Sequence, residues 1–270
     1  MRKKTIGIIG CGTIGSALAR FADRELKGKI KDILLMDADP VKSRELMEKL
    51  SDARIPDSMA RLISDADLIV EAASCEVVPD IILSDECAGK DLMIMSVGGL
   101  LKNKGLFARA EEKGVKIIVP SGAVSGIDAI KAAGIAGIEN VTITTRKSPK
   151  SLKGAPYILE TKLDIDNITE ETVIFEGNVI DAVNGFPKNI NVAAVLSIAG
   201  IGPERTKVKI IVSPGYDRNT HEIEVTGKAG RIFTRTENIP SPDNPKTSYL
   251  AVLASMASLK GYFSSVRVGT

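Results

Sequence analysis

The chain has 270 residues, of which 44% are hydrophobic and 26% charged, so it contains enough apolar material for one large packed domain or two smaller ones. Its 36 basic and 34 acidic residues leave a formal net charge of +2, which gives no sequence-independent attraction to nucleic acid. No apolar run approaches the roughly 20 residues that a membrane-spanning helix needs, and we therefore expect neither nucleic acid nor a membrane as a partner.

The three cysteines, Cys11, Cys75 and Cys87, are widely spaced and include no CxxC pair. An odd number of cysteines is a poor disulfide framework, so a reducing cytoplasm is the expected location. The basic start of the chain is similar to that of a signal peptide, but glycines interrupt the apolar stretch too early for one. With a single histidine and no clustered ligand residues, the sequence predicts no metal site.

Short apolar runs alternate with longer amphipathic segments through the first half of the chain, which is typical of a parallel sheet with helices on both faces. The runs are rich in Ile, Leu and Val and lack polar alternation, as in strands buried on both sides. The predicted strands are residues 5–9, 32–36, 68–71, 91–95 and 115–119. The predicted helices are residues 14–25, 41–50, 77–88 and 104–113. We therefore expect a Rossmann-type doubly wound α/β domain over residues 1–122.

Residues 10–15 match the pattern GxGxxG between the first predicted strand and the first predicted helix. Gly10 permits the tight turn, Gly12 lets the backbone approach a pyrophosphate, and Gly15 lets the helix pack against the strand. At the start of the helix, Thr13 and Ile14 present N–H groups and the positive end of the helix dipole to the phosphates. This strand, turn and helix together predict a dinucleotide site.

Asp37 follows the glycine turn by about 20 residues, at the end of the next predicted strand, as the dinucleotide fingerprint requires. Its carboxylate would accept hydrogen bonds from the adenosine ribose hydroxyls, and its charge should repel a 2′-phosphate. NAD is therefore the expected cofactor. NADP stays possible, because Lys42 and Arg44 follow closely and could offset that charge.

Two more loops follow predicted strands at the edge where open α/β sheets bind ligands. Residues 71–75, which include Ala73, follow the third strand, and residues 96–99 follow the fourth. We expect Ala73 to lie against the cofactor. Gly98 and Gly99 either contact the cofactor as well or simply make a turn.

The sequence changes character at residues 120–126, Pro-Ser-Gly-Ala-Val-Ser-Gly, and we place a domain boundary after residue 122. Strands with two-residue alternation are predicted at residues 140–146, 207–212 and 222–226, mixed with helices at 128–133 and 192–199. We expect an α+β domain over residues 123–245, built on an open mixed sheet whose outer face could pack against a twin subunit.

A proline-rich break at residues 240–245 precedes the last predicted helix, which runs from Thr247 to Leu259. Leu250, Leu253, Ala254 and Ala257 share one face of that helix. We expect the C-terminal segment, residues 246–270, to pack back on the dinucleotide-binding domain.

Four stretches of the second half resemble the L-aspartate dehydrogenases. They are Ser-Gly-Ala-Val-Ser-Gly at residues 121–126, Thr-Arg-Lys-Ser-Pro at 145–149, Lys-Asn-Ile-Asn-Val-Ala-Ala at 188–194, and Asp-Arg-Asn-Thr-His-Glu-Ile at 217–223. The resemblance extends from the glycine turn to the closing helix. It implies oxidation of L-aspartate at Cα, with hydride passing to the nicotinamide, and it implies a homodimer. The resulting iminoaspartate would be hydrolysed to oxaloacetate and ammonia or passed to NAD biosynthesis.

The resemblance also implies residue roles. The residue that matches His221 is catalytic, and those that match Ala123 and Asn189 contact the cofactor. Asn189 has a simpler alternative as the cap of the helix predicted at residues 192–199.

His221 is the only histidine in the chain, so it is the one candidate for an imidazole acid or base. An unperturbed pKa of about 6.5 suits proton transfer near neutral pH. A lone histidine is more often structural. Here its polar surroundings in the sequence and the resemblance point to catalysis or substrate binding.

A dicarboxylate substrate requires positive charge, and arginine can pair with a carboxylate through two parallel hydrogen bonds. The candidates beside the matching stretches are Lys188, Arg146, Lys147 and Arg218. Each of them is equally suited to a solvated surface position.

Three other functions deserve comparison. An aldehyde dehydrogenase of similar build would need a cysteine nucleophile at the domain junction, where this chain has Ser121, Ala123 and Ser125 instead. A related reductase would act on another small acid, of the dihydrodipicolinate or homoserine type. A non-catalytic NAD sensor would use the same fold to control a partner.

Overall fold

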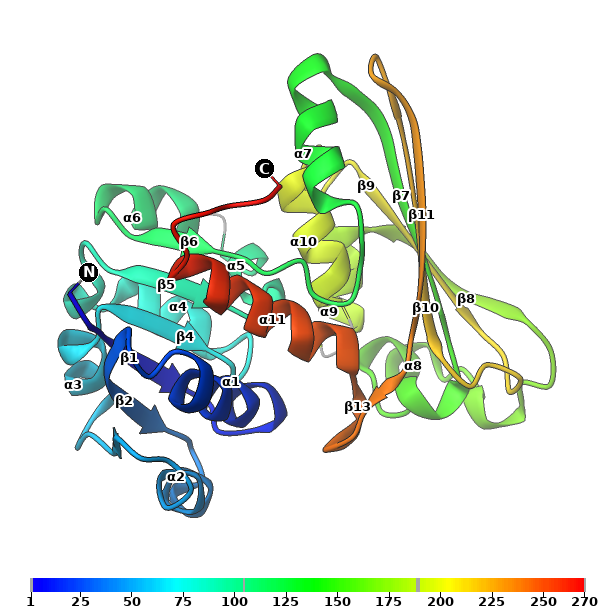
Figure 1. Ribbon diagram of the computed structural model, residues 1–270. Coiled ribbons are helices and arrows are strands. Elements are labelled where there is room, and N and C mark those ends of the chain that lie inside the picture. The colour runs from blue at the N-terminus through cyan, green and yellow to red at the C-terminus, as the bar shows by residue number, and fades with distance from the viewer. Residues whose placement is uncertain (1, 104, 188–189, 270) are drawn as a thin grey trace. The chain divides into compact units, whose positions relative to one another are not determined.

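The computed structural model describes residues 2–103, 105–187 and 190–269, and the chain divides into two compact units (Figure 1). The first unit runs to Pro120 and includes Val252–Arg267. The second unit is Ser121–Ala251 with the last residues from Val268. Within the described ranges, no helix is long and apolar enough to span a bilayer.

The first unit contains a six-stranded parallel sheet in the order β3-β2-β1-β4-β5-β6, which confirms the predicted Rossmann-type fold. The central strands are buried because helices cover both faces, as the run of Ile, Leu and Val residues predicted. The strands are β1 (Lys4–Ile9), β2 (Ile30–Met36), β3 (Ala53–Arg54), β4 (Leu68–Glu71), β5 (Asp91–Ile94) and β6 (Lys116–Ile118).

Most helices of the first unit match the predicted ones, with three differences. The segment predicted as one helix over residues 77–88 is broken at Ser84, whose extended backbone ends α4 before a short 3₁₀ helix, η1. A short helix, α5, begins at Gly98, and neither α5 nor α3 was predicted from the sequence. The elements are α1 (Thr13–Glu25), α2 (Pro40–Met47), α3 (Met59–Asp65), α4 (Val77–Leu83), η1 (Asp85–Cys87), α5 (Gly98–Leu101) and α6 (Leu106–Glu112).

The second unit is built on a five-stranded mixed sheet in the order β11-β10-β7-β9-β8, as predicted. Strands β7 and β9 are parallel, and the other neighbours are antiparallel. The strands are β7 (Ile138–Lys147), β8 (Thr172–Asn178), β9 (Thr206–Val212), β10 (Asn219–Gly227) and β11 (Gly230–Asn238).

Helices lie on one face of this sheet, here called the inner face, while the outer face carries no helix in the part of the chain that the structure describes (Figure 1). Successive side chains of a strand point to opposite faces of the sheet. The helices cover the inner face because the apolar side chains lie there, among them the buried Val141, Ile143, Ile223 and Val225. The helices are α7 (Ile127–Ala136), α8 (Pro156–Thr161), α9 (Val179–Gly185) and α10 (Asn191–Ala199), with 3₁₀ helices η2 (Pro149–Leu152) and η3 (Ile165–Asn167).

The predicted proline-rich break is a small hairpin of β12 (Pro240–Ser241) and β13 (Asn244–Ser248). The last helix, α11 (Tyr249–Tyr262), therefore begins two residues later than expected. Leu259 and the following Phe263 join the hydrophobic core of the first unit. The ammonium of Lys29 donates a hydrogen bond of 2.7 Å to the carbonyl of Phe263, which fixes the end of this segment.

Candidate active site

Two glycines of the turn at residues 10–15 are required by packing within the first unit. Gly10 has a φ of +100°, and a Cβ built on it would lie 2.5 Å from the carbonyl of Ala72 and 2.7 Å from the nitrogen of Ala73. A Cβ on Gly15 would lie 1.8 Å from the carbonyl oxygen of Gly10. No side chain fits at either position, so the turn is tightly closed against the strand β1 and the loop after β4.

Gly12 differs from its neighbours, because a Cβ at this position would have no described atom within 4 Å. Protein packing therefore does not require a glycine here. The helix α1 begins directly after Gly12, and the described part of the chain offers no side-chain cap and no acidic side chain in the first turn. The space beside Gly12 and the positive end of α1 together fit the pyrophosphate of a dinucleotide.

Asp37 lies beside the glycine turn, as predicted. Its carboxylate accepts hydrogen bonds from the backbone N–H of Cys11 at 2.7 Å and of Asp39 at 2.9 Å. Each carboxylate oxygen has a second lone pair, so ribose hydroxyls can still bind. The structure thus brings Gly10, Ala73 and Asp37 together around one turn of the first unit.

Glu71 organises the two loops at the carboxyl ends of β4 and β5. Its fully buried carboxylate accepts hydrogen bonds from the N–H of Ala73 at 2.8 Å and from the N–H and hydroxyl of Ser96, both at 2.9 Å. Burial raises the pKa of this carboxyl, against the opposing effect of those hydrogen bonds. Sequence reasoning did not assign Glu71 a role, although its place at a strand end was a usable signal.

The cysteines are buried, and burial raises the pKa of each thiol. The pKa of Cys11 is raised to about 12 and that of Cys87 to about 11. Thiols held in the protonated form are poor nucleophiles. This agrees with the argument against aldehyde dehydrogenase chemistry. The described residues also contain no group of three or more His, Cys, Asp or Glu side chains able to hold a metal ion.

His221 lies inside the strand β10 and not at its exposed start, with Thr145 of β7 and Thr236 of β11 as its cross-strand partners. Only 3% of the residue is exposed. Its Nδ1 lies 3.0 Å from the hydroxyl oxygen of Thr145. This hydrogen bond to Thr145 therefore holds the histidine on the inner face.

Lys147 occupies the same face of β7 as Thr145, two residues further along, and is 7% exposed. Burial lowers the pKa of Lys147 to about 8. Burial and the charge of Lys147 together lower the pKa of His221 to about 3. The ordinary imidazole value expected from the sequence is therefore wrong for this environment, in which His221 is neutral throughout the physiological range.

A small pocket opens beside these groups in the second unit. Its walls are mostly apolar and come from β7, β9, the end of η2 and the start of α10. The lining residues are Thr145, Lys147, Leu152, Ile190, Val192, Ala193, Val208 and Ile210.

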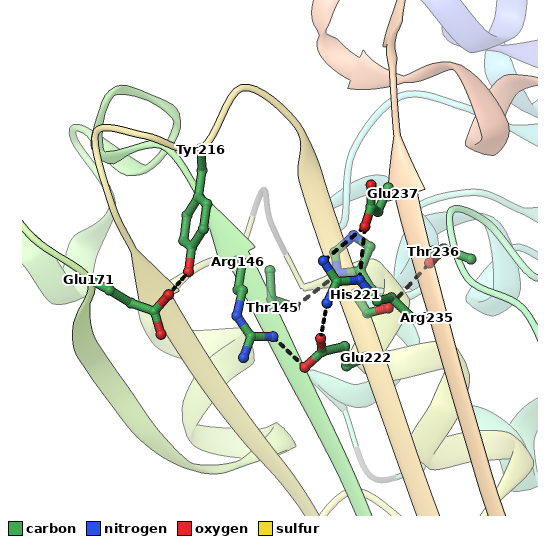
Figure 2. A network of polar contacts seen from close by, with 9 residues as sticks. All are labelled: Thr145, Arg146, Glu171, Tyr216, His221, Glu222, Arg235, Thr236 and Glu237. Atoms are coloured by element: carbon green, nitrogen blue, oxygen red, sulfur yellow. Dashed lines mark hydrogen bonds and ion pairs between the residues drawn. The ribbon is translucent and has the colours of Figure 1, made fainter.

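Arg146 is separated from His221 by the sheet itself, because neighbouring residues of a strand point to opposite faces. Its guanidinium pairs with Glu222 on the outer face. Figure 2 shows the carboxylate of Glu222 between the guanidinium groups of Arg146 and Arg235, the latter at 2.9 Å. Arg218 is exposed and lies 3.8 Å from the carboxylate of Asp217.

Lys188 and Asn189, predicted to bind the substrate and the cofactor, lie outside the described residues. The helix that follows them has Ile190 as its N-terminal cap residue. Ala123, the other predicted cofactor contact of this unit, is buried. Its carbonyl accepts hydrogen bonds from the hydroxyl of Thr236 at 3.2 Å and the amide of Asn238 at 3.1 Å.

Asn238 is a further polar residue that sequence reasoning missed. It is buried, and its side-chain amide also donates to the carbonyl of Asn219 at 3.2 Å. Its Oδ1 atom has no hydrogen-bond partner among the described residues. A buried acceptor without a donor is uncommon in proteins, so this atom is a candidate contact for a ligand N–H.

Comparison with known proteins identifies similar sequences for both units. A family model described as aspartate dehydrogenase, C-terminal, matches residues 128–262, and one described as homoserine dehydrogenase, NAD binding domain, matches residues 10–120. An L-aspartate dehydrogenase of Methanosarcina barkeri is 44% identical, covering 98% of this chain and 99% of that protein. One of Nitrosopumilus maritimus is 40% identical, covering 99% of this chain and 100% of that protein.

Solved structures give the same result for the fold. The crystal structure of aspartate dehydrogenase from Thermotoga maritima matches with a TM-score of 0.76 and 27% identity, covering 99% of this chain and 100% of that chain. A putative homoserine dehydrogenase from Archaeoglobus fulgidus matches with a TM-score of 0.54 at 15% identity, covering 97% of this chain and 100% of that one. The second likeness concerns the fold alone.

Proposed function

The chain belongs to the aspartate dehydrogenase family, and on that basis we propose that it is an NAD-dependent dehydrogenase that oxidises L-aspartate at Cα. The observation that carries the proposal is the placement of the single histidine. His221 is buried on the inner face and hydrogen-bonded to Thr145, and the charge of Lys147 contributes to lowering its pKa. A neutral imidazole beside a cation suits a substrate that carries negative charge and must lose a proton.

Features of both units fit the cofactor. In the first unit, Gly12 and the start of α1 would hold the pyrophosphate, and Asp37 favours NAD over NADP because its charge repels a 2′-phosphate. In the second unit, the free acceptor of Asn238 beside Ala123 would suit the N–H of a carboxamide. The family resemblance adds Asn189. When bound there, the cofactor would supply a nicotinamide as the hydride acceptor for Cα of the substrate.

His221 would exchange the proton through Nε2, because Thr145 occupies Nδ1. When Nδ1–H donates to the Thr145 hydroxyl, Nε2 is an acceptor. It can then take a proton from the substrate amine or from water that attacks the imine. A nearby substrate carboxylate raises the low pKa of the imidazole and makes it a stronger base. The product is iminoaspartate, which yields oxaloacetate and ammonia on hydrolysis or enters NAD biosynthesis.

One assay tests this activity directly. NADH formation is followed with a panel of L- and D-amino acids and with homoserine, using NAD and NADP in parallel. We expect turnover with L-aspartate, little with its D-enantiomer or homoserine, and a higher kcat/KM with NAD. Oxidation of homoserine but not aspartate would instead favour the related dehydrogenase, and tight NADH binding without turnover would favour a sensor.

We also place the protein in the cytoplasm as a homodimer. Three buried, unbridged cysteines suit a reducing compartment. The outer face of the sheet exposes Phe233 and Val173 to 56% and 47%, as a surface covered by a second copy would.

A further inference from the structure

Residues 121–126 form the first loop of the second unit, and they follow β6, which ends at Ile118. The loop therefore continues from the carboxyl end of a parallel strand, and open α/β sheets bind their ligands outside these ends. Gly122 and Gly126 have φ values of +71° and +84°, which side-chain-bearing residues rarely adopt. The backbone thus sets the shape of the loop near both of its ends.

A row of side chains on β11 holds this loop. Thr234, Thr236 and Asn238 are alternate residues that share the inner face of the sheet, while the residues between them are exposed. The hydroxyl of Thr234 donates a hydrogen bond of 3.4 Å to the carbonyl of Ser125. The hydroxyl of Thr236 and the amide of Asn238 donate to the carbonyl of Ala123 at 3.2 and 3.1 Å. Three side chains of one strand therefore fix the loop to the sheet.

Thr236 also connects the loop to the strand that carries His221. The two residues are cross-strand partners, so their side chains lie on the same face. The Thr236 hydroxyl lies 3.4 Å from the carbonyl oxygen of His221 (Figure 2) and 3.2 Å from that of Ala123. Its single proton is shared between these two acceptors. One hydroxyl therefore bridges the backbone of Ala123 and the backbone of His221.

Asn238 makes a second connection of the same kind. Its amide nitrogen donates to the carbonyl of Ala123 and, at 3.2 Å, to the carbonyl of Asn219 at the start of β10. These two acceptors determine which way the amide points, so Oδ1 is the atom without a partner among the described residues. A nonpolar side chain would avoid the cost of that buried acceptor. What the amide contributes here is the pair of hydrogen bonds that it donates.

We propose that Thr236 and Asn238 are positioning residues, which hold Ala123 where the nicotinamide end of the dinucleotide binds beside His221. The inference rests on the proposed function. Hydride transfer and proton transfer must act on one substrate molecule, so the nicotinamide and the imidazole need a fixed separation. The hydrogen bonds of Thr236 fix the loop and His221 to each other within one unit. The glycine turn and Asp37, in the other unit, would hold the rest of the dinucleotide.

The test compares NADH with ADP-ribose, which has the adenosine and pyrophosphate of the dinucleotide but no nicotinamide. Thr236→Val nearly keeps the shape of the side chain and removes its hydroxyl. We expect this variant to bind NADH about threefold to tenfold more weakly in a fluorescence titration, as the loss of one hydrogen bond implies. Its affinity for ADP-ribose, measured by calorimetry, should not change. The melting temperature should stay within about 3 °C, because Asn238 still donates to Ala123.

Two further variants serve as controls. Thr236→Ser restores the hydroxyl and should return the NADH affinity to within about twofold of the wild-type value. Thr142→Val makes the same exchange on the outer face of β7, where Thr142 lies opposite Glu224. It should leave the affinities for both ligands unchanged. Binding of ADP-ribose also reports the folded fraction of each variant.

The outcomes separate the two proposals. Unchanged NADH affinity in Thr236→Val, or equal losses for NADH and ADP-ribose, would contradict the inference. So would a Thr236→Ser protein that binds NADH as weakly as Thr236→Val, or an equal loss in Thr142→Val. Aspartate oxidation by the wild-type protein would leave the proposed function standing in each of these cases. If the wild-type protein does not oxidise aspartate, the function fails, and the two titrations still decide whether Thr236 positions the cofactor.

Discussion

His221 and Lys147 present two basic side chains to one apolar face, where burial opposes the charged form of both. Because the lysine has the higher pKa, it carries the positive charge near neutral pH and the imidazole stays neutral. This division of roles is useful for a substrate with two carboxylates and an amine. The neutral ring remains able to accept a proton.

His221→Ala should therefore remove proton transfer without disturbing the cofactor. We expect turnover of aspartate to fall at least about a hundredfold, the lower end of general acid–base contributions. NADH affinity, measured by fluorescence titration, should stay within about twofold, because the glycine turn and Asp37 belong to the other unit. The matched control is Glu224→Gln, on the same strand but paired with Arg231. Near-normal turnover in His221→Ala would refute the assignment.

The burial of Lys147 also predicts a pH-dependent stability. Its pKa is lowered to about 8 in the folded protein and lies near 10.4 in an unfolded chain. The unfolded state therefore binds the proton first, and the stabilisation present above pH 10 is lost as the pH falls through 8. The loss amounts to roughly 3 kcal/mol.

Lys147→Met removes this proton linkage. The variant should be more stable than the wild-type protein by about 3 kcal/mol at pH 7, with a smaller advantage at pH 10. Urea unfolding curves of both proteins at the two pH values measure the difference. An advantage that does not change with pH would show that the lysine is not buried as described.

At the scale of an element, the glycine turn contains one glycine that serves cofactor binding, Gly12, and one that packing requires, Gly15. Gly12 has a φ of −72°, which alanine adopts readily, and a Cβ there would meet no described atom. Gly12→Ala should thus keep the melting temperature but weaken NADH binding at least about tenfold, because the methyl group enters the pyrophosphate space. Gly15→Ala should lower the melting temperature, since its Cβ would overlap the carbonyl of Gly10. Unchanged NADH affinity in Gly12→Ala would rule out this cradle.

Several strands and helices of the fold can be predicted from the sequence, and others cannot. The strands β1, β2, β4 and β5 and the helix α1 were predicted within about two residues at each end, because a long apolar run or a clear helical period fixes each of them. The short β3 and α3 were missed, since two to seven residues hold too little periodicity. The break at Ser84 was missed because apolar spacing continues across it.

The candidate site was predictable only in part, for a related reason. Two-residue alternation in β7 already implies that Thr145 and Lys147 share a face and that Arg146 does not. Which face is covered, and which residue of β10 lies opposite Thr145, depends on register and packing between segments far apart in the chain. The burial that lowers the pKa of His221 also results from packing between segments far apart in the chain. The same is true of the Oδ1 atom of Asn238, which has no hydrogen-bond partner among the described residues.

At the scale of the whole molecule, the outer face of the five-stranded sheet matters for assembly, because no helix among the described residues of the second unit covers it. Its centre holds the ion pairs of Glu222 with Arg146 and Arg235 (Figure 2). Exposed Phe233 and Val173 lie on strands at the two sides of the sheet. A self-complementary pairing of two such faces around a twofold axis would bury these apolar groups.

Phe233→Glu should disrupt that pairing, because a carboxylate buried in an interface without a partner is costly. We expect the wild-type protein to sediment as a dimer and the variant to shift toward the monomer at micromolar concentration. Phe107→Glu is the matched control, since Phe107 is also partly exposed but belongs to α6 in the first unit. His221 projects from the opposite face, so the dissociated variant should keep its turnover of L-aspartate. A wild-type monomer, or a Phe233→Glu protein that remains dimeric, would show that the outer face is not the interface.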